Sequence, residues 1–252
     1  MVISGSHGRR HDTAADAAAP PDSPTTGHLR RGVPATSHPS PAPRRRLRPD
    51  SALHGVGALV LDWDGTLADT HQARYRALSQ ALAPFGVLLD EDFYRARSGR
   101  PVLDLLDRLP VPVPADRVRA ASARLLLEHL RSGHLQPVPA TLALLHQARA
   151  AGLPCAIASS ASRRLVTTGL RALDLEHMFA AVVTADETSR GKPAPEVFLR
   201  AAAELALPPA ACLAVDDAHD GIAAARAAGM PVLTLTGTPP VLVVPPPERA
   251  VP

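Results

Sequence analysis

Short apolar runs that end at polar residues recur between positions 58 and 235, and longer segments with helical spacing separate them. The run at 58–61 ends at Asp62, a second ends at Ser159, and a third ends at Asp216. Unbroken aliphatic runs of this length are typical of strands buried on both faces of a parallel sheet. Their alternation with helices predicts an α/β fold with a doubly wound parallel sheet.

The predicted elements divide the chain into a core and a helical insertion. Strands are predicted at 58–62, 154–159, 180–184, 211–215 and 231–235. Helices are predicted at 68–84, 91–97, 101–109, 115–131, 163–173 and 222–228, with a rigid Pro-rich break at 110–114. We therefore expect a catalytic core formed by 51–68 and 139–238, interrupted by a helical segment at 69–138.

The charge of the chain is concentrated at its amino terminus. Residues 1–50 contain eight Arg and four Asp, are rich in Pro and lack apolar periodicity, so we expect them to be disordered. An inert tail or a misassigned start codon is favoured over contact of the Arg44–Arg48 cluster with nucleic acid or an anionic surface. The rest of the chain carries a net charge of −1, which makes nucleic acid an unexpected partner for the core. Residues 239–252 are Pro-rich and expected to be extended or loose.

The sequence also indicates the cellular compartment in which we expect the protein. Its apolar runs are too short to cross a bilayer, and its amino terminus lacks the continuous apolar segment of a secretion signal. Cys155 and Cys212 each fall inside a predicted buried strand, where we expect free thiols rather than a disulfide. We expect a cytoplasmic protein without membrane association, and we favour a monomer.

Two pairs of aspartates stand at the ends of predicted strands. Asp62 and Asp64 follow the first strand, and Asp216 and Asp217 follow the fourth. Ligands of open α/β sheets bind beyond the carboxyl ends of the strands, and four carboxylates gathered there require neutralisation by a divalent cation and a lysine. All-oxygen ligands at a site that also holds phosphate favour Mg²⁺. The alternative is a turn that merely carries two Asp before Gly65.

Lys192 and Ser159 are the other candidates for chemistry. Lys192 is the only lysine among 27 Lys and Arg residues, which suggests a crowded place where a compact ammonium fits and a guanidinium does not. Ser159 stands where a strand gives way to a helix, a position that offers a hydroxyl and backbone N–H groups to an anion. The alternatives are chance survival of one lysine and an ordinary helix cap at Ser160 or Ser162.

In this order, the four elements resemble the motifs of the haloacid dehalogenase superfamily, and the resemblance covers roughly residues 56–237. The matching segments are DWDGTLADT at 62–70, Ser159, Lys192 in Gly-Lys-Pro, and Asp216-Asp217 with 221–222 and 227–230. The helical insertion resembles the α-helical cap of the subfamily that contains sugar-phosphate phosphatases, phosphoglycolate phosphatase and β-phosphoglucomutase. Asp216 is a departure, because many close relatives carry Glu there.

The resemblance implies roles for individual residues. Asp62 would attack phosphorus and form an aspartyl-phosphate, and Asp64 would pass a proton to the leaving group and later accept one from water. Ser159 and Lys192 would hold the transferring phosphoryl oxygens. The implied ligands of Mg²⁺ are Asp62, Asp64 through its backbone carbonyl, Asp217, and Asp216 directly or through water.

Substrate recognition is expected to involve Gly65, Thr66, Arg74, Ser160 and Arg100. Gly65 would let the backbone approach the phosphate, and in similar proteins the loop at 98–101 descends onto the active site. We expect a Mg²⁺-dependent phosphatase of a small phosphorylated metabolite, such as a sugar or polyol phosphate. A β-phosphoglucomutase-like phosphomutase and a non-catalytic metabolite-phosphate sensor are the alternatives. Val102 and Leu103, where a mutase-like pattern would place cations, favour the phosphatase.

Overall fold

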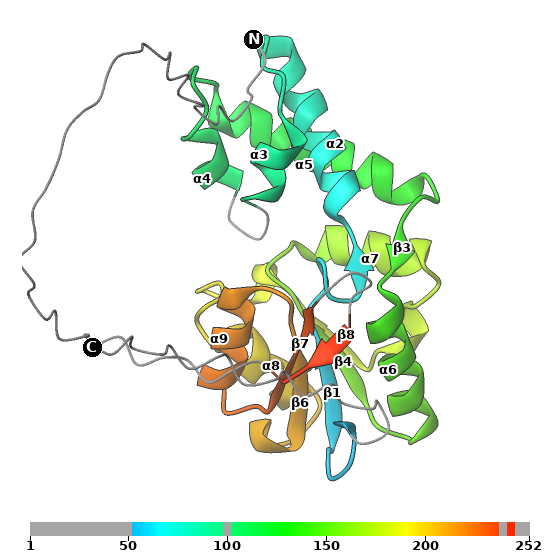
Figure 1. Ribbon diagram of the computed structural model, residues 1–252. Coiled ribbons are helices and arrows are strands. Elements are labelled where there is room, and N and C mark those ends of the chain that lie inside the picture. Colours follow the sequence, from blue (N-terminus) through cyan, green and yellow to red (C-terminus); the bar gives the residue numbers. More distant parts are fainter. Residues whose placement is uncertain (1–51, 98–101, 237–240, 245–252) are drawn as a thin grey trace, which may run out of the picture. The chain divides into compact units, whose positions relative to one another are not determined.

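The central feature of the fold is a parallel sheet. The computed structural model describes residues 52–97, 102–236 and 241–244 (Figure 1). Within these residues the strand order is β5-β4-β1-β6-β7-β8, and all neighbours are parallel except β7 and β8. The strands are β1 (Ala58–Leu61), β4 (Cys155–Ala158), β5 (Ala181–Val183), β6 (Cys212–Val215), β7 (Val232–Thr236) and β8 (Val241–Val243). The five predicted strands are confirmed to within one residue at each end.

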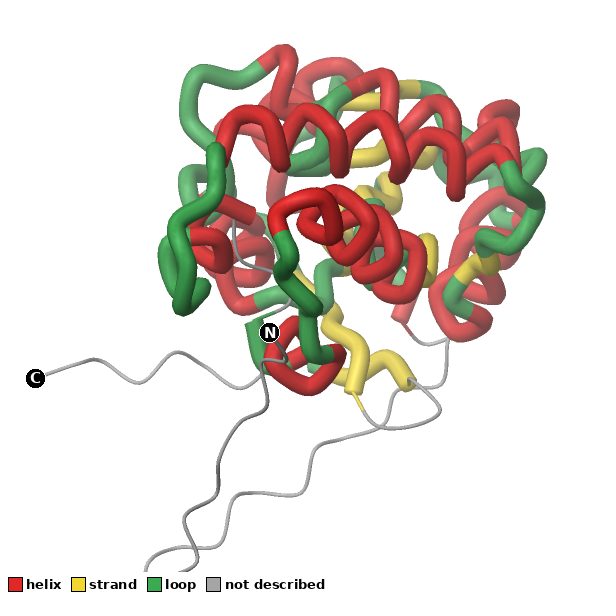
Figure 2. The backbone as a smooth tube through the Cα atoms, turned by 90° about the horizontal axis from the view of Figure 1, so that it is seen from above, coloured by secondary structure: helices red, strands yellow, loops and turns green. Residues whose placement is uncertain are grey.

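Both faces of this sheet are covered by helices. On one face, Leu59 and Leu61 pack into a cluster with side chains of α6 (Pro139–Ala150) and α7 (Arg163–Ala172). On the other, Ala58 and Val60 pack with side chains of α8 (Glu196–Glu204) and α9 (His219–Ala227). Figure 2 shows, from above, helices in red around the strands in yellow. Because successive side chains enter two different apolar layers, the strands are aliphatic throughout, as a doubly wound sheet requires.

The insertion between the first two long strands is helical and has its own apolar cluster, which includes Leu78, Leu82, Leu105 and Val118. Its helices are α2 (His71–Leu82), η1 (Ala83–Phe85), α3 (Glu91–Arg95), α4 (Val102–Leu106) and α5 (Ala115–Arg131). The bounds predicted for α5 are confirmed.

The predicted start of the first insertion helix is wrong. Ala68–Asp69 form β2, which pairs antiparallel with β3 (Gln136–Pro137), and Val138 N donates to Leu67 O at 2.8 Å. These backbone groups are used between segments far apart in the sequence, so helical spacing could not reveal them. The chain enters and leaves the helical segment through this pair of short strands.

The carboxyl-terminal part of the chain holds more structure than predicted. Val241–Val243, which the sequence placed in an extended tail, form β8 along the edge of β7, with Thr236 opposite Val241. The helix predicted from Ile222 begins three residues earlier, at His219. The predicted amino-terminal tail, 239–240 and 245–252 lie outside the described residues.

Two further expectations concern the cysteines and the possibility of a membrane-spanning helix. Cys155 and Cys212 are confirmed as buried, free thiols inside strands. Among the residues described, none of the helices combines the length and apolarity needed to cross a membrane.

Candidate active site

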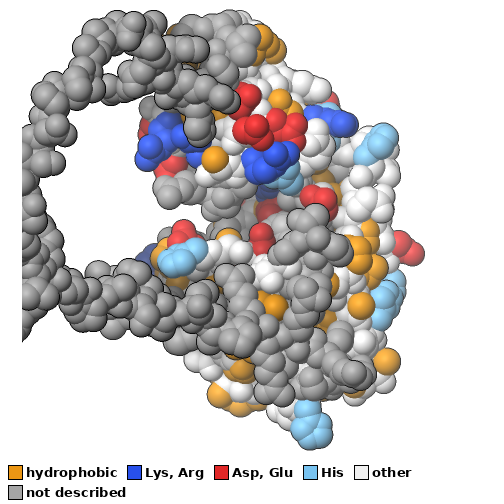
Figure 3. Space-filling view, viewed as in Figure 1, with side chains coloured by type: hydrophobic (Ala, Val, Ile, Leu, Met, Phe, Trp, Pro, Cys, Tyr) orange, Lys and Arg blue, Asp and Glu red, His pale blue; other side chains and the backbone are white. Residues whose placement is uncertain are grey.

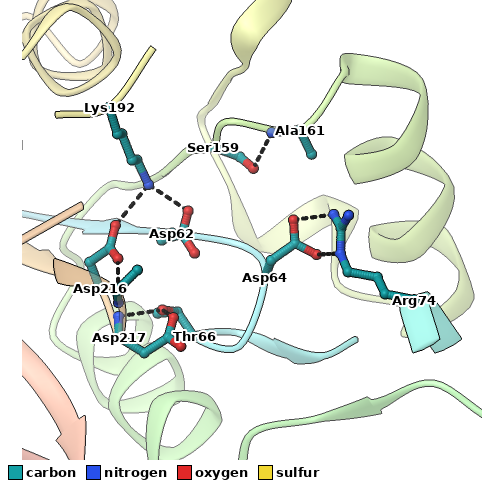
Figure 4. Close-up of polar contacts among 10 residues, drawn as sticks. Asp62, Asp64, Thr66, Arg74, Ser159, Ala161, Lys192, Asp216 and Asp217 are labelled. Atoms are coloured by element: carbon teal, nitrogen blue, oxygen red, sulfur yellow. Dashed lines mark hydrogen bonds and ion pairs between the residues drawn. The ribbon is translucent and has the colours of Figure 1, made fainter. Parts of the chain in front are cut away.

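The carboxyl end of β1 brings Asp62 against the only lysine of the chain. Asp62 N donates to Val215 O at 2.9 Å, which keeps the residue in line with the neighbouring strand β6. Lys192 Nζ donates to Asp62 Oδ1 at 2.5 Å and to Asp216 Oδ2 at 2.7 Å (Figure 4). The Lys192 side chain is only 7% exposed. One buried ammonium therefore joins the first, third and fourth of the sequence motifs.

Asp217 completes an acidic group at this end of the sheet. Carboxylate oxygens of Asp62, Asp216 and Asp217 all lie within 4.8 Å of one another. One ammonium contacts two of these carboxylates, so the group keeps two negative charges when all three are ionised, and one divalent cation would balance them. Their oxygens are the ligands that hard cations prefer. The group can bind a metal ion, and the shorter side chain of Asp216 places its carboxylate within the group.

Burial of this group changes the proton affinity of its members. Desolvation raises the pKa of Asp62 to about 7, although Lys192 pulls it down, and desolvation raises the pKa of Asp217 to about 6. Burial alone would lower the pKa of Lys192, but Asp62 and Asp216 raise it above its ordinary value. Without a cation Asp62 therefore keeps part of its proton near neutral pH, and binding of a cation would displace that proton.

Thr66 and Gly65 shape the surroundings of Asp217. Thr66 is fully buried; its hydroxyl donates to Asp217 Oδ1 at 2.8 Å and accepts from Asp217 N at 3.0 Å. Gly65 has φ +77°, and a Cβ on it would lie 2.5 Å from Asp217 Oδ2. Both residues were expected at the substrate. In the structure they hold and accommodate a carboxylate of the acidic group.

Helix α9 makes a similar adaptation for Asp216. Ala218 N donates to Asp216 Oδ1 at 3.0 Å, and a Cβ on Gly221 would overlap the Asp216 carboxylate. Gly221 therefore lets the first turn of α9 approach a buried acid.

The side chain of Asp64 belongs to a different set of contacts. Asp64 Oδ1 accepts from Thr70 Oγ1 at 2.7 Å and from Arg74 Nε at 2.8 Å, and Asp64 Oδ2 accepts from Arg74 Nη2. Figure 4 shows this carboxylate directed toward Arg74, on the opposite side from Lys192. Arg74, which the sequence analysis expected at the substrate, is bound to Asp64.

The second motif lies at the end of β4. Ser159 is 1% exposed; its N–H donates to Val183 O, and its Oγ accepts from Ala161 N at 3.1 Å. The hydroxyl proton is thus left to donate to another acceptor. Ser160 is exposed at the same turn, and Arg100 lies outside the described residues.

Sequence reasoning missed Glu196, which organises the segment that carries Lys192. Glu196 Oε2 accepts from Ser189 N, Ser189 Oγ and Arg190 N, and Glu196 Oε1 accepts from Arg190 Nε at 2.5 Å. Glu196 is also the first residue of α8, where an acid interacts favourably with the helix dipole. An acid directly after Pro195 was the available sequence signal.

Trp63 stands between the two aspartates that follow β1, and its indole is buried in the core. It is 1% exposed and is among the largest fully buried side chains. A Cβ on Gly169 of α7 would overlap the indole ring, so the helix carries Gly where the ring lies against it.

A parallel α/β sheet with an acidic group at its carboxyl edge occurs in enzymes of several kinds, and comparison with known proteins identifies the family. The model of the haloacid dehalogenase-like hydrolase family matches residues 59–235, so the chain belongs to that family. It is a phosphoric monoester hydrolase of this family.

Three relatives illustrate the match. Protein CbbY from Rhodobacter capsulatus is 33% identical over 189 residues, covering 70% of this chain and 83% of CbbY. Fructose-1-phosphate phosphatase YqaB from Escherichia coli is 34% identical over 173 residues, covering 68% of this chain and 92% of YqaB. The crystal structure of a CbbY mutant from Rhodobacter sphaeroides in complex with xylulose-(1,5)bisphosphate is 25% identical, with a TM-score of 0.64, covering 72% of this chain and 87% of that one.

Proposed function

We propose that the protein is a Mg²⁺-dependent phosphatase that hydrolyses a small sugar or polyol phosphate through an aspartyl-phosphate on Asp62. The observation that carries the proposal is the contact of one buried lysine with Asp62 and Asp216 beside Asp217. A nucleophile, a cation site and a fixed positive charge then lie within reach of one phosphoryl group. Such an arrangement suits phosphoryl transfer, in which positioning and charge neutralisation provide most of the catalysis.

The first step would transfer the phosphoryl group to the protein. An Asp62 oxygen attacks phosphorus in line, and the bond from phosphorus to the leaving oxygen breaks. The Lys192 ammonium and the Ser159 hydroxyl bind oxygens of the transferring group. Asp64, after taking up a proton from solvent, gives that proton to the leaving oxygen, so that an alcohol departs instead of an alkoxide.

The second step would release phosphate. Asp64 accepts a proton from the water that attacks the aspartyl-phosphate, and the bond from phosphorus to Asp62 breaks. Asp62, Asp216, Asp217 and the Asp64 backbone carbonyl would hold Mg²⁺, which supplies positive charge to the phosphoryl oxygens when bound.

A small substrate is supported by the relatives and by the surface. YqaB is named a fructose-1-phosphate phosphatase, and CbbY is described with a sugar bisphosphate. On the described face in Figure 3, acidic and basic side chains lie side by side, as in α3, where Arg95 pairs with Glu91 and Asp92. Mixed charge of this kind does not form the basic field that nucleic acid needs. A cytoplasmic location and a monomeric state stay predictions.

The experiment is a screen of the purified full-length protein against phosphorylated sugars, polyols and small acids, with Mg²⁺, measuring released phosphate. We expect at least one ester to be hydrolysed, activity to disappear on chelation and to return with added Mg²⁺. Ca²⁺ should substitute poorly, because its looser coordination misplaces the carboxylates. Asp62→Asn, which keeps the shape of the side chain, is the matched inactive control.

Product analysis separates the alternatives. If the product is an isomeric phosphate ester and no free phosphate is released, the protein is a phosphomutase and not a phosphatase. Tight binding of esters without any turnover would favour the sensor. Undiminished phosphate release by Asp62→Asn would rule out the proposed nucleophile.

A further inference from the structure

Both oxygens of the Asp64 carboxylate are occupied within the protein. Thr70 and Arg74 donate to Oδ1, and Arg74 donates to Oδ2 through a second nitrogen. A guanidinium that binds both oxygens of a carboxylate fixes the direction of that side chain as well as its charge. Figure 4 shows that this direction leads away from the ammonium of Lys192, which contacts Asp62.

This orientation conflicts with the role proposed for Asp64, and the inference rests on that proposed function. To serve the leaving oxygen of a phosphoryl group on Asp62, the Asp64 side chain has to separate from Arg74. Separation leaves a guanidinium that is only 33% exposed without its partner, which is unfavourable unless another anion takes the place of Asp64.

Arg74 is placed to receive such an anion. One third of its side chain is open to solvent, and it stands on α2, one turn into the helical insertion. Burial alone would lower the pKa of Arg74, whereas the negative charges of Asp64 and Asp62 raise it. The guanidinium therefore interacts electrostatically with the proposed nucleophile as well as with Asp64.

We propose that Arg74 selects substrates with a second anionic group, a phosphate or a carboxylate on the leaving part of the ester. The guanidinium exchanges Asp64 for this group, and the freed Asp64 takes up a proton from solvent and turns toward Asp62. A planar fork binds phosphate and carboxylate in the same bidentate manner, so either group can make the exchange. An ester whose leaving part is neutral cannot release Asp64 in this way.

The binding test uses the Asp62→Asn protein with Mg²⁺ and calorimetry, so that no turnover interferes. The probes are fructose 1-phosphate, with a neutral leaving part, fructose 1,6-bisphosphate, and 2-phosphoglycolate as the carboxylate arm. We expect one or both bis-anionic probes to bind about 10- to 100-fold more tightly than fructose 1-phosphate. Adding Arg74→Gln should remove this preference, Arg74→Lys should keep part of it, and Arg76→Gln, which changes an exposed arginine of the same helix, should keep all of it.

In the turnover test, one variant should change kcat/KM for two kinds of ester in opposite directions. With Arg74→Gln, kcat/KM for bis-anionic esters should fall about 10- to 100-fold, while kcat/KM for a neutral-leaving-part ester should rise, because Asp64 is no longer held. A merely structural role would lower both values together, and that result would overturn the proposal. An unchanged preference in Arg74→Gln would overturn it as well. If the unmodified protein releases no phosphate from any of the esters, the proposed function itself is refuted instead.

Discussion

Asp62 and Asp64 are separated by one residue, yet the structure puts them in opposite surroundings. Asp62 is 7% exposed and shares one ammonium with Asp216, in a group that carries more negative than positive charge. Asp64 forms an ion pair with Arg74, and its side chain is partly exposed. The charge of the first carboxylate is only partly compensated, by an ammonium that it shares, whereas the charge of the second is compensated by its own guanidinium.

The difference shows how one strand end can supply two kinds of acid. Burial with an incomplete set of partners raises the pKa of Asp62 to about 7, so that a metal ion at this group would compete with a proton. A full set of partners holds Asp64 in place until something removes Arg74. The predictions below test this contrast.

The largest effect is expected from Asp62→Asn. The amide cannot form the aspartyl-phosphate, so phosphate release should fall by about 10⁴-fold or more. Circular dichroism should show an unchanged fold. If the variant keeps activity within about tenfold of the unmodified protein, Asp62 is not the nucleophile.

The Asp64→Asn variant should respond differently to esters with good and with poor leaving groups. This difference distinguishes the role of Asp64 from that of Asp62. With p-nitrophenyl phosphate, whose phenolate departs without protonation, we expect a burst of about one nitrophenolate per protein, followed by slow turnover. Alkyl phosphates should show no burst. Stopped-flow absorbance measures the burst, and its occurrence in Asp62→Asn as well would contradict the assignment.

Lys192→Arg keeps the charge that Asp62 and Asp216 share but enlarges the cation. A guanidinium does not fit a side-chain site that is 7% exposed and lies 5.0 Å from the centre of the Phe198 ring. We expect kcat/KM to drop about 10²- to 10³-fold. Arg164→Lys, an exchange at an exposed position, is the control and should leave kcat/KM unchanged.

Thermal unfolding should show a cation effect that depends on pH. The folded pKa values of about 7 for Asp62 and about 6 for Asp217 lie above the ordinary 3.8, so their contribution favours folding at low pH and is lost as pH rises through 6–7. Mg²⁺ binds the ionised acids, and it should therefore raise Tm more at pH 8 than at pH 5. Asp217→Asn should reduce the Mg²⁺ shift. An equal shift at both pH values would contradict the argument.

The smallest effect is expected from Thr70→Val, which removes one neutral donor from Asp64 while Arg74 remains. The buried hydrogen bond is worth about 1 kcal/mol, so the free energy of unfolding should fall by roughly that amount. Denaturant titration measures it. A loss of several kcal/mol would mean that Thr70, and not Arg74, is the main partner of Asp64.

Most of the sheet and the meeting of the motifs could be predicted, because both depend on local patterns. Aliphatic runs marked the strands, and the carboxyl ends of parallel strands share one edge, which is why Asp62 and Asp216 come together. The solitary Lys192 stood out by composition alone.

What could not be predicted depends on contacts between distant segments or on side-chain direction. β2 exists because Ala68–Asp69 meets Gln136–Pro137, and neither dipeptide has the length or pattern of a strand. The direction of Asp64 follows from the place where α2 begins, since that start brings Arg74 within reach of its carboxylate. Helical spacing says nothing about either.

The contact between Trp63 and Gly169 links the segment that carries Asp62 and Asp64 to helix α7. A methyl group at position 169 would overlap the indole, so the ring that stands between the two acids would have to move. Engineers who vary α7 for stability or for new partners should therefore keep this glycine constant, and natural drift along that helix should be least free at this turn.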